Sequence, residues 1–460
     1  MSGKIKRLLI RMIKLLNIVM MTVPFMVAWY LFYSKQTAVP YYIKGEIVII
    51  SLFVVLYVIY AHIYDAFWIS LNRISELIYS QALSAFIADA IMYVVICLLI
   101  KKIPAIWPMI LIFAAQILLS ALWSANAHKF YFSTHKPRKT GVIYDQREGL
   151  ENLLNEYGLN KKFEVVHISS VDDCINKNLD QLKSLEVVFL CGIHSHERNI
   201  ILKYCIANDV QVYVIPRIGD VIMSGATQMH MLHLPMLRVN RYAPTAEYRW
   251  TKRIFDVVVC GIALVVLSPV MLITAIAIKL TDGGPVFYKQ CRLTQNGKKF
   301  DVLKFRSMRV DAEKDGVARL STGDKDNRVT AVGKIIRKVR IDELPQLINI
   351  LKGDMSIVGP RPERPEIAAQ YEQELPEFAL RLQAKAGLTG YAQVYGKYNT
   401  TPYDKLQMDL MYISKPSFFE DLRIIFATVK IILIPESTEG VAEGQTTAND
   451  TKVKQKLQEG

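Results

Sequence analysis

The stretch "RKVRIDELPQL", residues 337–347, places two adjacent carboxylates directly after a group of cations. Asp342 and Glu343 follow Arg337 and Arg340, and a proline comes almost at once. Adjacent acids before a proline are also typical of an exposed helix start, because the positive end of the helix dipole attracts acidic side chains. Taken alone, the stretch supports both a helix start and a pair of acids that does chemistry.

Two further stretches carry cations near this pair in the sequence. "VLKFRSMRV" contains Lys304 and Arg306, and "MSIVGPRPERPE" contains Arg361. Arginine offers a planar fork and lysine a compact charge to phosphate oxygens. A pyrophosphate substrate needs such donors, together with a divalent ion held by carboxylates. The residue types in these stretches therefore indicate phosphate chemistry.

An aspartate can also be the nucleophile itself, by attacking phosphorus to form an acyl phosphate. An adjacent glutamate would then hold the metal ion or handle a proton. Nearby cations favour the charged form of a carboxylate, so we expect them to keep Asp342 ionised at neutral pH. An attacking carboxylate requires that ionised form.

Each of these cations also has a simpler interpretation. Lys304 and Arg306 alternate with apolar residues, which is typical of the solvent-facing side of a strand. Arg361 lies between two prolines and cannot sit inside a regular helix, and a tight loop of this kind is more typical of a binding site. We interpret Arg361 as functional, whereas for Lys304 and Arg306 the residues alone favour the solvent-facing strand.

The elements that must position these residues begin with a membrane segment. Of the 460 residues 52% are hydrophobic, and the formal net charge of +14 suits a partner with phosphates. Four apolar runs, at residues 15–33, 47–64, 83–100 and 103–122, are each close to the roughly 20 residues that a helix needs to cross a bilayer. Basic residues precede the first run and follow the fourth, which predicts cytoplasmic ends. We expect four transmembrane helices within residues 1–132.

Short β-like runs alternate with helical ones over residues 138–241, for example "TGVIYD", "FEVVHIS" and "LEVVFLCG". This alternation predicts a small parallel α/β domain of Rossmann-like type. The stretch "GVIYDQREG" lacks the GxGxxG spacing that lets a backbone approach a pyrophosphate. We therefore expect a packing or regulatory module without a dinucleotide site.

A fifth apolar run covers residues 254–280 and has Ser268 and Pro269 near its midpoint. A proline inside a helix removes a backbone hydrogen bond and clashes with the preceding turn, so we expect a kink, where a serine hydroxyl can bond a freed carbonyl. Basic flanks on both sides favour a reentrant helix whose ends lie on one cytoplasmic face. A kinked crossing helix is the alternative, and it would carry Asp342 to the outer face.

Residues 281–434 are soluble in character and are divided into short elements by "GPRP" and "GLTG". We expect residues 248–434 to form a mainly α-helical catalytic domain that includes the reentrant helix. In "GYAQVYGKYN", Gln393 and Lys397 could contact a base or a sugar, although loop stability explains them equally well. Residues 436–460 are polar, lack apolar periodicity and are expected to form a disordered tail.

Four longer stretches carry a resemblance to a known family. They are "KRIFDVVVCGIALVVLSPV", "GPVFYKQCRLTQNGKKFDVLKFRSM", "AVGKIIRKVRIDELPQLINILKGDMSIVGPRP" and "GLTGYAQVYGK". In this order they resemble the bacterial sugar transferases, monotopic phosphoglycosyl transferases that begin the assembly of polyprenyl-linked glycans. The whole chain resembles the longer members, which act in exopolysaccharide, capsule or O-antigen synthesis.

The resemblance implies that Asp342 is the nucleophile and Glu343 its partner, with Mg²⁺ bound at this pair. It implies transfer of a hexose 1-phosphate from a UDP-sugar to undecaprenyl or another polyprenyl phosphate, with release of UMP and a covalent intermediate on the aspartate. It also implies a multi-pass protein of the bacterial inner membrane whose catalytic domain faces the cytoplasm. The substrate-binding set that we expect is Lys304, Arg306, Arg337, Arg361, Gln393 and Lys397.

This chain departs from the family pattern at two positions. Thr294 stands where an RxG motif usually has glycine, and Ala386 stands where a proline usually precedes GxTG. The first change bears on the shape of a loop and the second on its stiffness. Neither change touches the acid pair.

Two other classes of function compete with this interpretation. A basic membrane-anchored regulatory or nucleic-acid-binding protein would need a recognisable basic helix or aromatic platform, and we find no helix-turn-helix or RNP-like pattern. An NAD-dependent membrane oxidoreductase is disfavoured by the missing glycine fingerprint. We expect a UDP-sugar, a polyprenyl phosphate and the membrane as partners and no nucleic acid, while a homo-oligomer and the identity of the sugar stay open.

Overall fold

In the computed structural model the chain divides into two compact units, Met1–Ile215 and Pro216–Gly460. The structure describes residues 3–37, 43–145, 149–242, 244–309, 328–396 and 401–432. Buried apolar side chains form separate clusters within each unit.

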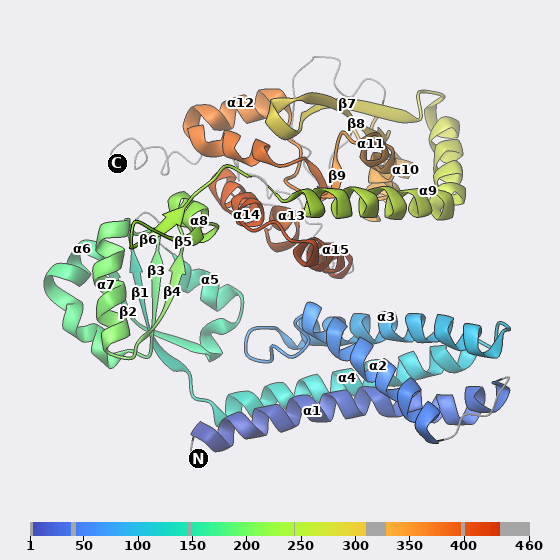
Figure 1. Ribbon diagram of the computed structural model, residues 1–460, viewed down its shortest axis with the longest axis horizontal. Coiled ribbons are helices and arrows are strands. Elements are labelled where there is room, and N and C mark those ends of the chain that lie inside the picture. The colour runs from blue at the N-terminus through green and yellow to red at the C-terminus, as the bar shows by residue number, and fades with distance from the viewer. Residues whose placement is uncertain are drawn as a thin grey trace. The chain divides into compact units, whose positions relative to one another are not determined.

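Long apolar helices open the first unit (Figure 1). They are α1 (Gly3–Ala28), which a π-helical turn at Trp29–Tyr33 and a 3-10 turn at Ser34–Gln36 extend, α2 (Ile43–Ile63), α3 (Ile74–Ile100) and α4 (Trp107–Thr134). All four are long and apolar enough to cross a membrane, and that they do cross one stays a prediction. The fourth begins later than its apolar run, and Pro108 occupies its first turn, where a missing N–H costs no helical hydrogen bond.

The helices of this bundle are joined by buried polar side chains. Asn17 Nδ2 and Ser120 Oγ both donate to Gln81 Oε1, at 3.0 and 2.9 Å, and Tyr57 Oη donates to Asn17 Oδ1 at 2.7 Å. All four residues are fully buried. Because these side chains are buried away from water, the hydrogen bonds between them help to fix how the helices pack.

A four-stranded sheet of order β2-β1-β3-β4 forms the rest of the first unit. Its strands are β1 (Arg138–Tyr144), β2 (Phe163–Ser170), β3 (Val187–Cys191) and β4 (Gln211–Ile215). Its helices are α5 (Leu150–Glu156), α6 (Val171–Asp173) and α7 (Ser195–Ala207), with short 3-10 and π turns at Leu159–Lys161, Cys174–Asn178 and Leu179–Ser184. Every neighbouring pair of strands in this sheet is parallel, so the predicted parallel α/β region is confirmed.

The second unit begins with α8 (Ile218–Ser224) and an antiparallel hairpin of β5 (Thr227–Met231) and β6 (Leu234–Arg238). The sequence pattern groups this segment with the α/β domain, whereas the structure places it in the second unit. The reason is that α8 packs on α14 (Pro402–Ser414), where Gln407 donates a hydrogen bond to the carbonyl of Pro216.

Short elements follow the long helix α9 (Ala246–Asp282). The strands are β7 (Phe287–Leu293), β8 (Lys299–Phe305), β9 (Ser356–Val358) and β10 (Gly387–Thr389). The helices are α10 (Ala331–Lys338), α11 (Gln346–Lys352), α12 (Pro365–Glu374), α13 (Tyr391–Tyr395) and α15 (Phe418–Ile432), with 3-10 turns at Gln295–Gly297, Ile341–Glu343 and Pro376–Gln383.

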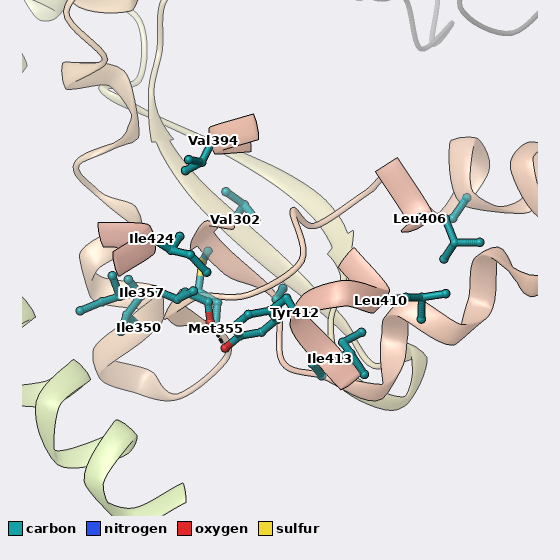
Figure 2. Packing of buried hydrophobic residues seen from close by; sticks show 14 of the residues in the cluster. Val302, Ile350, Met355, Ile357, Val394, Leu406, Leu410, Tyr412, Ile413 and Ile424 are labelled. Carbon is teal, nitrogen blue, oxygen red and sulfur yellow. Dashed lines mark hydrogen bonds between the residues drawn. The ribbon is translucent and has the colours of Figure 1, made fainter. Parts of the chain in front are cut away.

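One hydrophobic core joins these short elements (Figure 2). Ile350 of α11, Met355 before β9 and Ile424 of α15 are fully buried within it. Burying a side chain of this size stabilises the fold by about 1.5–3 kcal/mol relative to leaving it exposed. The core thereby holds α11 and β9 together although each is short.

Helix α9 is apolar enough to cross a membrane, and most of its apolar side chains are exposed. Pro269 lies inside it, and Ser268 Oγ donates to the carbonyl of Val265 at 2.7 Å. Figure 1 shows α9 as two limbs that meet at an angle. A change of direction is what a proline inside a helix produces. That both ends lie on one face of a membrane stays a prediction.

Candidate active site

Asp342 and Glu343 lie in the 3-10 turn between α10 and α11. Arg340 adopts a left-handed conformation with a φ of 56°, which turns the chain after α10. Pro345 then occupies the N-cap of α11. The acids do precede a helix, but the Glu343 side chain is only 15% exposed, so a solvated helix start does not describe them.

Three cationic side chains surround Glu343. Lys304 Nζ donates to its Oε1 at 3.0 Å, and Arg361 Nη2 lies 3.6 Å from the same oxygen. Arg340 Nη1 lies 3.9 Å from Oε2. Burial favours the neutral acid, but the attraction of these cations outweighs it and lowers the pKa of Glu343 to about 2. Glu343 is therefore a fixed anion near neutral pH.

Asp342 is affected in the opposite direction. Burial raises the pKa of its carboxyl, the charge of Glu343 raises it further, and the charges of Lys304 and Arg337 oppose this shift. From the sequence we expected cations to lower this pKa. The direction differs because burial outweighs them and because the closest cations engage the neighbouring glutamate. A carboxylate with a raised pKa is a stronger base, which suits an attacking group once it is ionised.

Two strands bring Lys304 and Arg361 to the acid pair. Strand β8 pairs with β7 so that Lys304 lies opposite Tyr288. Strand β9 pairs in parallel with β10, and the chain leaves β9 through Gly359 and Pro360 directly into Arg361. The Lys304 side chain is 22% exposed, which disagrees with the solvent-facing alternative for this strand.

The structure places the other predicted cations differently. Arg306 follows β8, is buried, and donates its backbone N–H to the carbonyl of Val286 at 2.9 Å. It is therefore not on a solvated strand face either. Arg337 lies in the last turn of α10 and acts on Asp342 through its charge. Lys397 lies outside the described residues, as does the predicted tail at 436–460.

A hollow beside Glu343 brings several of these side chains together. It is lined by Arg292, Val302, Lys304, Glu343, Gln346, Arg361, Pro362, Gly387, Leu388 and Gln393. Of the polar side chains in this lining, sequence reasoning missed Arg292 and Gln346. Arg292 is the arginine of the "CRLTQNG" stretch, and the unusual threonine two residues later was the signal that could have found it. Burial lowers the pKa of Arg292 to about 10, although it still carries a positive charge near neutral pH.

Gln393, which lines this hollow, has only one of its two amide ends hydrogen-bonded within the described ranges. Its Nε2 donates to the carbonyl of Leu388 at 3.0 Å. Its Oε1 is buried and accepts no hydrogen bond from any residue in the described ranges. Leaving a buried acceptor unsatisfied costs about 1–3 kcal/mol.

The base of α9 is attached to α11 and β9, the two elements that follow the acid pair in the chain. Arg253 donates to the carbonyls of Ile350 and Leu351, at 2.6 and 2.7 Å, at the end of α11. The carboxylate of Asp256 accepts from Ser356 Oγ at 2.7 Å and from the N–H of Ile357 at 3.2 Å in β9. These contacts connect the long apolar helix to α11 and β9, the elements on either side of which residues of the hollow lie in the chain.

The donors present decide whether the acid pair fits Mg²⁺. In the described part of the chain no group of three or more His, Cys, Asp and Glu side chains converges. Mg²⁺ commonly uses one or two carboxylates and completes its shell with water and substrate phosphates. Because Glu343 is engaged by cations, Asp342 is the carboxylate best placed to bind it. The pair fits an ion that is shared with a substrate.

Comparison with known proteins covers the same part of the chain. The profile of the family described as bacterial sugar transferase matches residues 247–435, which include every residue that lines the hollow. A protein of Aeromonas hydrophila named UDP-N-acetylgalactosamine-undecaprenyl-phosphate N-acetylgalactosaminephosphotransferase is 39% identical over 235 residues. That match spans 50% of this chain and 54% of the Aeromonas protein, so this chain covers about half the length of that relative.

Two further relatives are covered over more of their length. A protein of Caulobacter vibrioides named UDP-glucose:undecaprenyl-phosphate glucose-1-phosphate transferase is 40% identical over 206 residues, which are 44% of this chain and 76% of that protein. An uncharacterized sugar transferase of Bacillus subtilis is 39% identical over 188 residues, which are 41% of this chain and 90% of that protein.

Proposed function

The chain belongs to the bacterial sugar transferase family, and from this we propose that it transfers a sugar 1-phosphate from a UDP-sugar to polyprenyl phosphate. We take undecaprenyl phosphate as the acceptor, because the names of the Aeromonas and Caulobacter relatives contain it. The products are a polyprenyl diphospho-sugar and UMP. The observation that carries the proposal is that Asp342 directly precedes Glu343, whose carboxylate lies within 4 Å of Lys304 and Arg361.

The proposed reaction has two halves. First, a carboxylate oxygen of Asp342 attacks the β-phosphorus of the UDP-sugar. The bond from that phosphorus to the oxygen shared with the α-phosphate breaks, UMP leaves with the electron pair, and the sugar phosphate stays on the aspartate. An oxygen of polyprenyl phosphate then attacks the same phosphorus, and the carboxylate leaves in its ionised form. Each half exchanges one P–O bond for another.

The charged residues around the pair have separate tasks in this scheme. Lys304, Arg361 and Arg292 would stabilise the charge on the phosphate oxygens as each P–O bond changes. Glu343 holds two of these cations in place, and its fixed charge makes Asp342 more basic. The charge of Arg337 favours the ionised form of Asp342, which the attack requires.

We include Mg²⁺ in the proposal, held by Asp342 together with the phosphates of the donor. When bound, it would neutralise phosphate charge and favour the ionised carboxylate. The support is the fit of the donor set, in which Asp342 directly precedes the acid that lines a cation-rich hollow.

We also propose that α9 is a reentrant helix and that the catalytic unit faces the cytoplasm at the bacterial inner membrane. The interior proline, the basic flanks and the attachment of the α9 base to α11 and β9 support this arrangement. A soluble donor and a lipid acceptor could then use one site in turn. The reaction would be the first membrane step in the synthesis of an exopolysaccharide, a capsule or an O-antigen.

The sugar is best identified by experiment, because relatives of nearly equal identity carry names with different sugars. The Aeromonas name contains N-acetylgalactosamine, and the Caulobacter name contains glucose. The test is to incubate purified protein with a panel of UDP-sugars labelled at the β-phosphate, without lipid acceptor. We expect covalent label and release of UMP with at least one donor.

Asp342→Asn should abolish both the label and the release of UMP. Asp301→Asn is the matched control, because Asp301 is an exposed acid on β8, and it should keep both. Label retained by the Asp342 variant would contradict the role of this residue. Absence of UMP with every donor, with and without lipid, would contradict the function.

The comparisons do not favour a regulatory or nucleic-acid-binding protein, because the named relatives carry transferase names. The same assay separates the two functions. Only a transferase requires UMP to appear in step with the lipid-linked product.

A further inference from the structure

The loop that carries Arg361 is held by its carbonyl groups. Pro360 and Pro362 have no N–H, so at these positions the backbone can be fixed only through acceptors. Four consecutive carbonyls are bonded: Pro360 O accepts from Gly387 N (2.9 Å), Arg361 O from Arg381 Nη2 (2.8 Å), Pro362 O from Arg292 Nη1 (3.1 Å) and Glu363 O from Leu293 N (3.0 Å). Two of these four donors are guanidinium groups.

Arg381 reaches the loop from a buried position. It lies in the 3-10 turn Pro376–Gln383, and its side chain is 4% exposed. Its Nε donates to Oδ2 of Asp409 in α14 at 2.8 Å, its Nη2 lies 2.7 Å from the same oxygen, and the Asp409 side chain is 1% exposed. The guanidinium also lies over the ring of Phe378, 4.8 Å from its centre. Asp409 and Phe378 together fix the plane of the guanidinium.

Glu363 connects the two guanidinium groups that hold the loop. Its Oε1 lies 3.7 Å from Arg381 Nη1, and its Oε2 lies 3.7 Å from Arg292 Nη1. The loop therefore contributes an acid of its own to a continuous chain of charges. This chain runs from Asp409 through Arg381 and Glu363 to Arg292, which lines the hollow.

Stability alone is a poor explanation for a buried pair of this kind. Well-packed apolar residues of similar volume often stabilise a fold equally well or better than a buried ion pair. What such residues could not do is donate to the carbonyl of Arg361. The Arg361 guanidinium in turn lies 3.6 Å from Glu343, so a shift of its backbone would move a cation of the site.

We propose that Arg381, oriented by Asp409, is a positioning residue that fixes the carbonyl of residue 361 and thereby directs the Arg361 guanidinium to the diphosphate of the sugar nucleotide. The inference rests on the proposed function, because it takes a UDP-sugar as the ligand. It adds a requirement that lies outside the hollow, since neither Arg381 nor Asp409 is among the residues that line it.

The first test removes the pair as a unit, with Arg381→Met and Asp409→Leu in one protein. Removing one partner alone leaves a buried charge and risks unfolding, whereas the apolar pair can keep the fold. We expect the KM for the UDP-sugar to rise about tenfold, the effect of losing one charge-assisted hydrogen bond, with a smaller change in kcat. A second variant, Arg381→Lys with Asp409 retained, keeps the charge but loses the planar fork. Its KM should be raised nearly as much as that of the double replacement.

A double-mutant cycle with Arg361→Ala separates positioning from a general loss of structure. If Arg381 acts through Arg361, the paired replacement adds no further rise in KM once Arg361 is alanine. Additive effects would overturn the proposal. The control is Lys252→Met with Asp421→Leu, because this buried pair, 2.8 Å apart in the same unit, donates to none of the four carbonyls. We expect the control to leave the KM within about twofold.

Two further measurements do not depend on turnover. Hydrogen exchange of the peptide that covers residues 359–366 should be faster in the Arg381–Asp409 double replacement, and the affinity for UDP measured by calorimetry should fall about tenfold. Unchanged exchange and unchanged UDP affinity would overturn the positioning role. If wild-type protein releases no UMP from any donor, the proposed function fails, while these two measurements still decide whether Arg381 orders the loop.

Discussion

Thr294 Oγ1 accepts a hydrogen bond from the backbone N–H of Ala386 at 3.1 Å and donates to the carbonyl of Asp354 at 3.0 Å. Thr294 and Ala386 are the two positions at which the sequence departs from the pattern of the family that it resembles. A glycine at 294 would have no hydroxyl to accept with, and a proline at 386 would have no N–H to donate. The two departures are therefore structurally paired, next to Gly387 at the edge of the hollow.

The pairing predicts the outcome of exchanging both residues. Thr294→Gly or Ala386→Pro alone leaves a buried polar group without its partner, and each should lower the free energy of unfolding by about 1–3 kcal/mol. The double variant removes donor and acceptor together, so it should lose less than the sum of the two. Thermal unfolding in detergent measures all four proteins. Strict additivity would show that the two positions are independent.

The pKa of Asp342 is raised in the folded protein, and this predicts that ionisation of its carboxyl lowers the free energy of unfolding. Above the folded-state pKa, the ionised carboxylate destabilises the folded protein relative to the unfolded chain, and below the ordinary value of 3.8 both states are protonated and the effect vanishes. Asp342→Asn should therefore raise the unfolding temperature at pH 7 and lose this advantage as the pH falls below 4. The variant should be inactive, which separates stability from catalysis. A lower unfolding temperature at pH 7 would contradict the direction.

Glu343 predicts the opposite dependence on pH. Its pKa is about 2 in the folded protein and ordinarily 4.5, so its charge contributes stability that is fully present above about 4.5 and is lost as the pH falls toward 2. Wild-type protein should lose more stability between pH 5 and pH 2 than Glu343→Gln does. Unfolding by denaturant at a series of pH values measures the difference. Parallel curves for the two proteins would argue against the ion cluster.

Lys304 should matter more for rate than for folding. Lys304→Met removes the 3.0 Å contact with Glu343 and leaves two arginines near that acid. Removing one preorganised electrostatic group from a site typically slows the reaction about 10²–10³-fold, and we expect a loss in kcat within this range. Lys299→Met is the control, because Lys299 lies exposed on the same strand. Comparable losses in both variants would show that net charge, and not position, is responsible.

Removal of divalent ions should abolish formation of the covalent intermediate. Mg²⁺ shared between Asp342 and the donor phosphates would be lost to EDTA, and added Mg²⁺ should restore labelling, whereas Ca²⁺ should restore less because it prefers longer and more numerous oxygen contacts. Glu343→Gln should change the Mg²⁺ requirement less than Asp342→Glu does. Labelling that is unaffected by EDTA would remove Mg²⁺ from the proposal.

Cysteine labelling tests the reentrant helix. Exposed positions in the first turn of α9 and beyond its end, Arg249→Cys and Lys298→Cys, should both react with an impermeant maleimide from the cytoplasmic side only. The exposed Cys291 is first replaced by serine, and Lys102→Cys, in the turn between α3 and α4, should react from the outer side. Reaction of the two α9 positions from opposite sides would establish a crossing helix instead.

Much of the architecture could be predicted from neighbours along the chain. Apolar runs of sufficient length identified the helices that can cross a membrane, and the alternation of short strands and helices identified the parallel sheet. Pro269 indicated a kink in α9, and the clustering of acids and cations indicated chemistry on phosphates. Each of these properties depends on local hydrophobicity, backbone geometry or residue type, which neighbouring residues reveal.

The distribution of charge within the site required the fold. Lys304 and Glu343 are 39 residues apart in the chain, but Lys304 Nζ lies 3.0 Å from Glu343 Oε1. The cations therefore contact Glu343, while burial raises the pKa of Asp342. The guanidinium groups of Arg292 and Arg381 likewise reach the Arg361 loop from other segments of the chain, and no sequence motif links these segments to the loop. Coulombic interaction and desolvation depend on distance and depth in three dimensions, so the spacing of residues along the chain does not contain them.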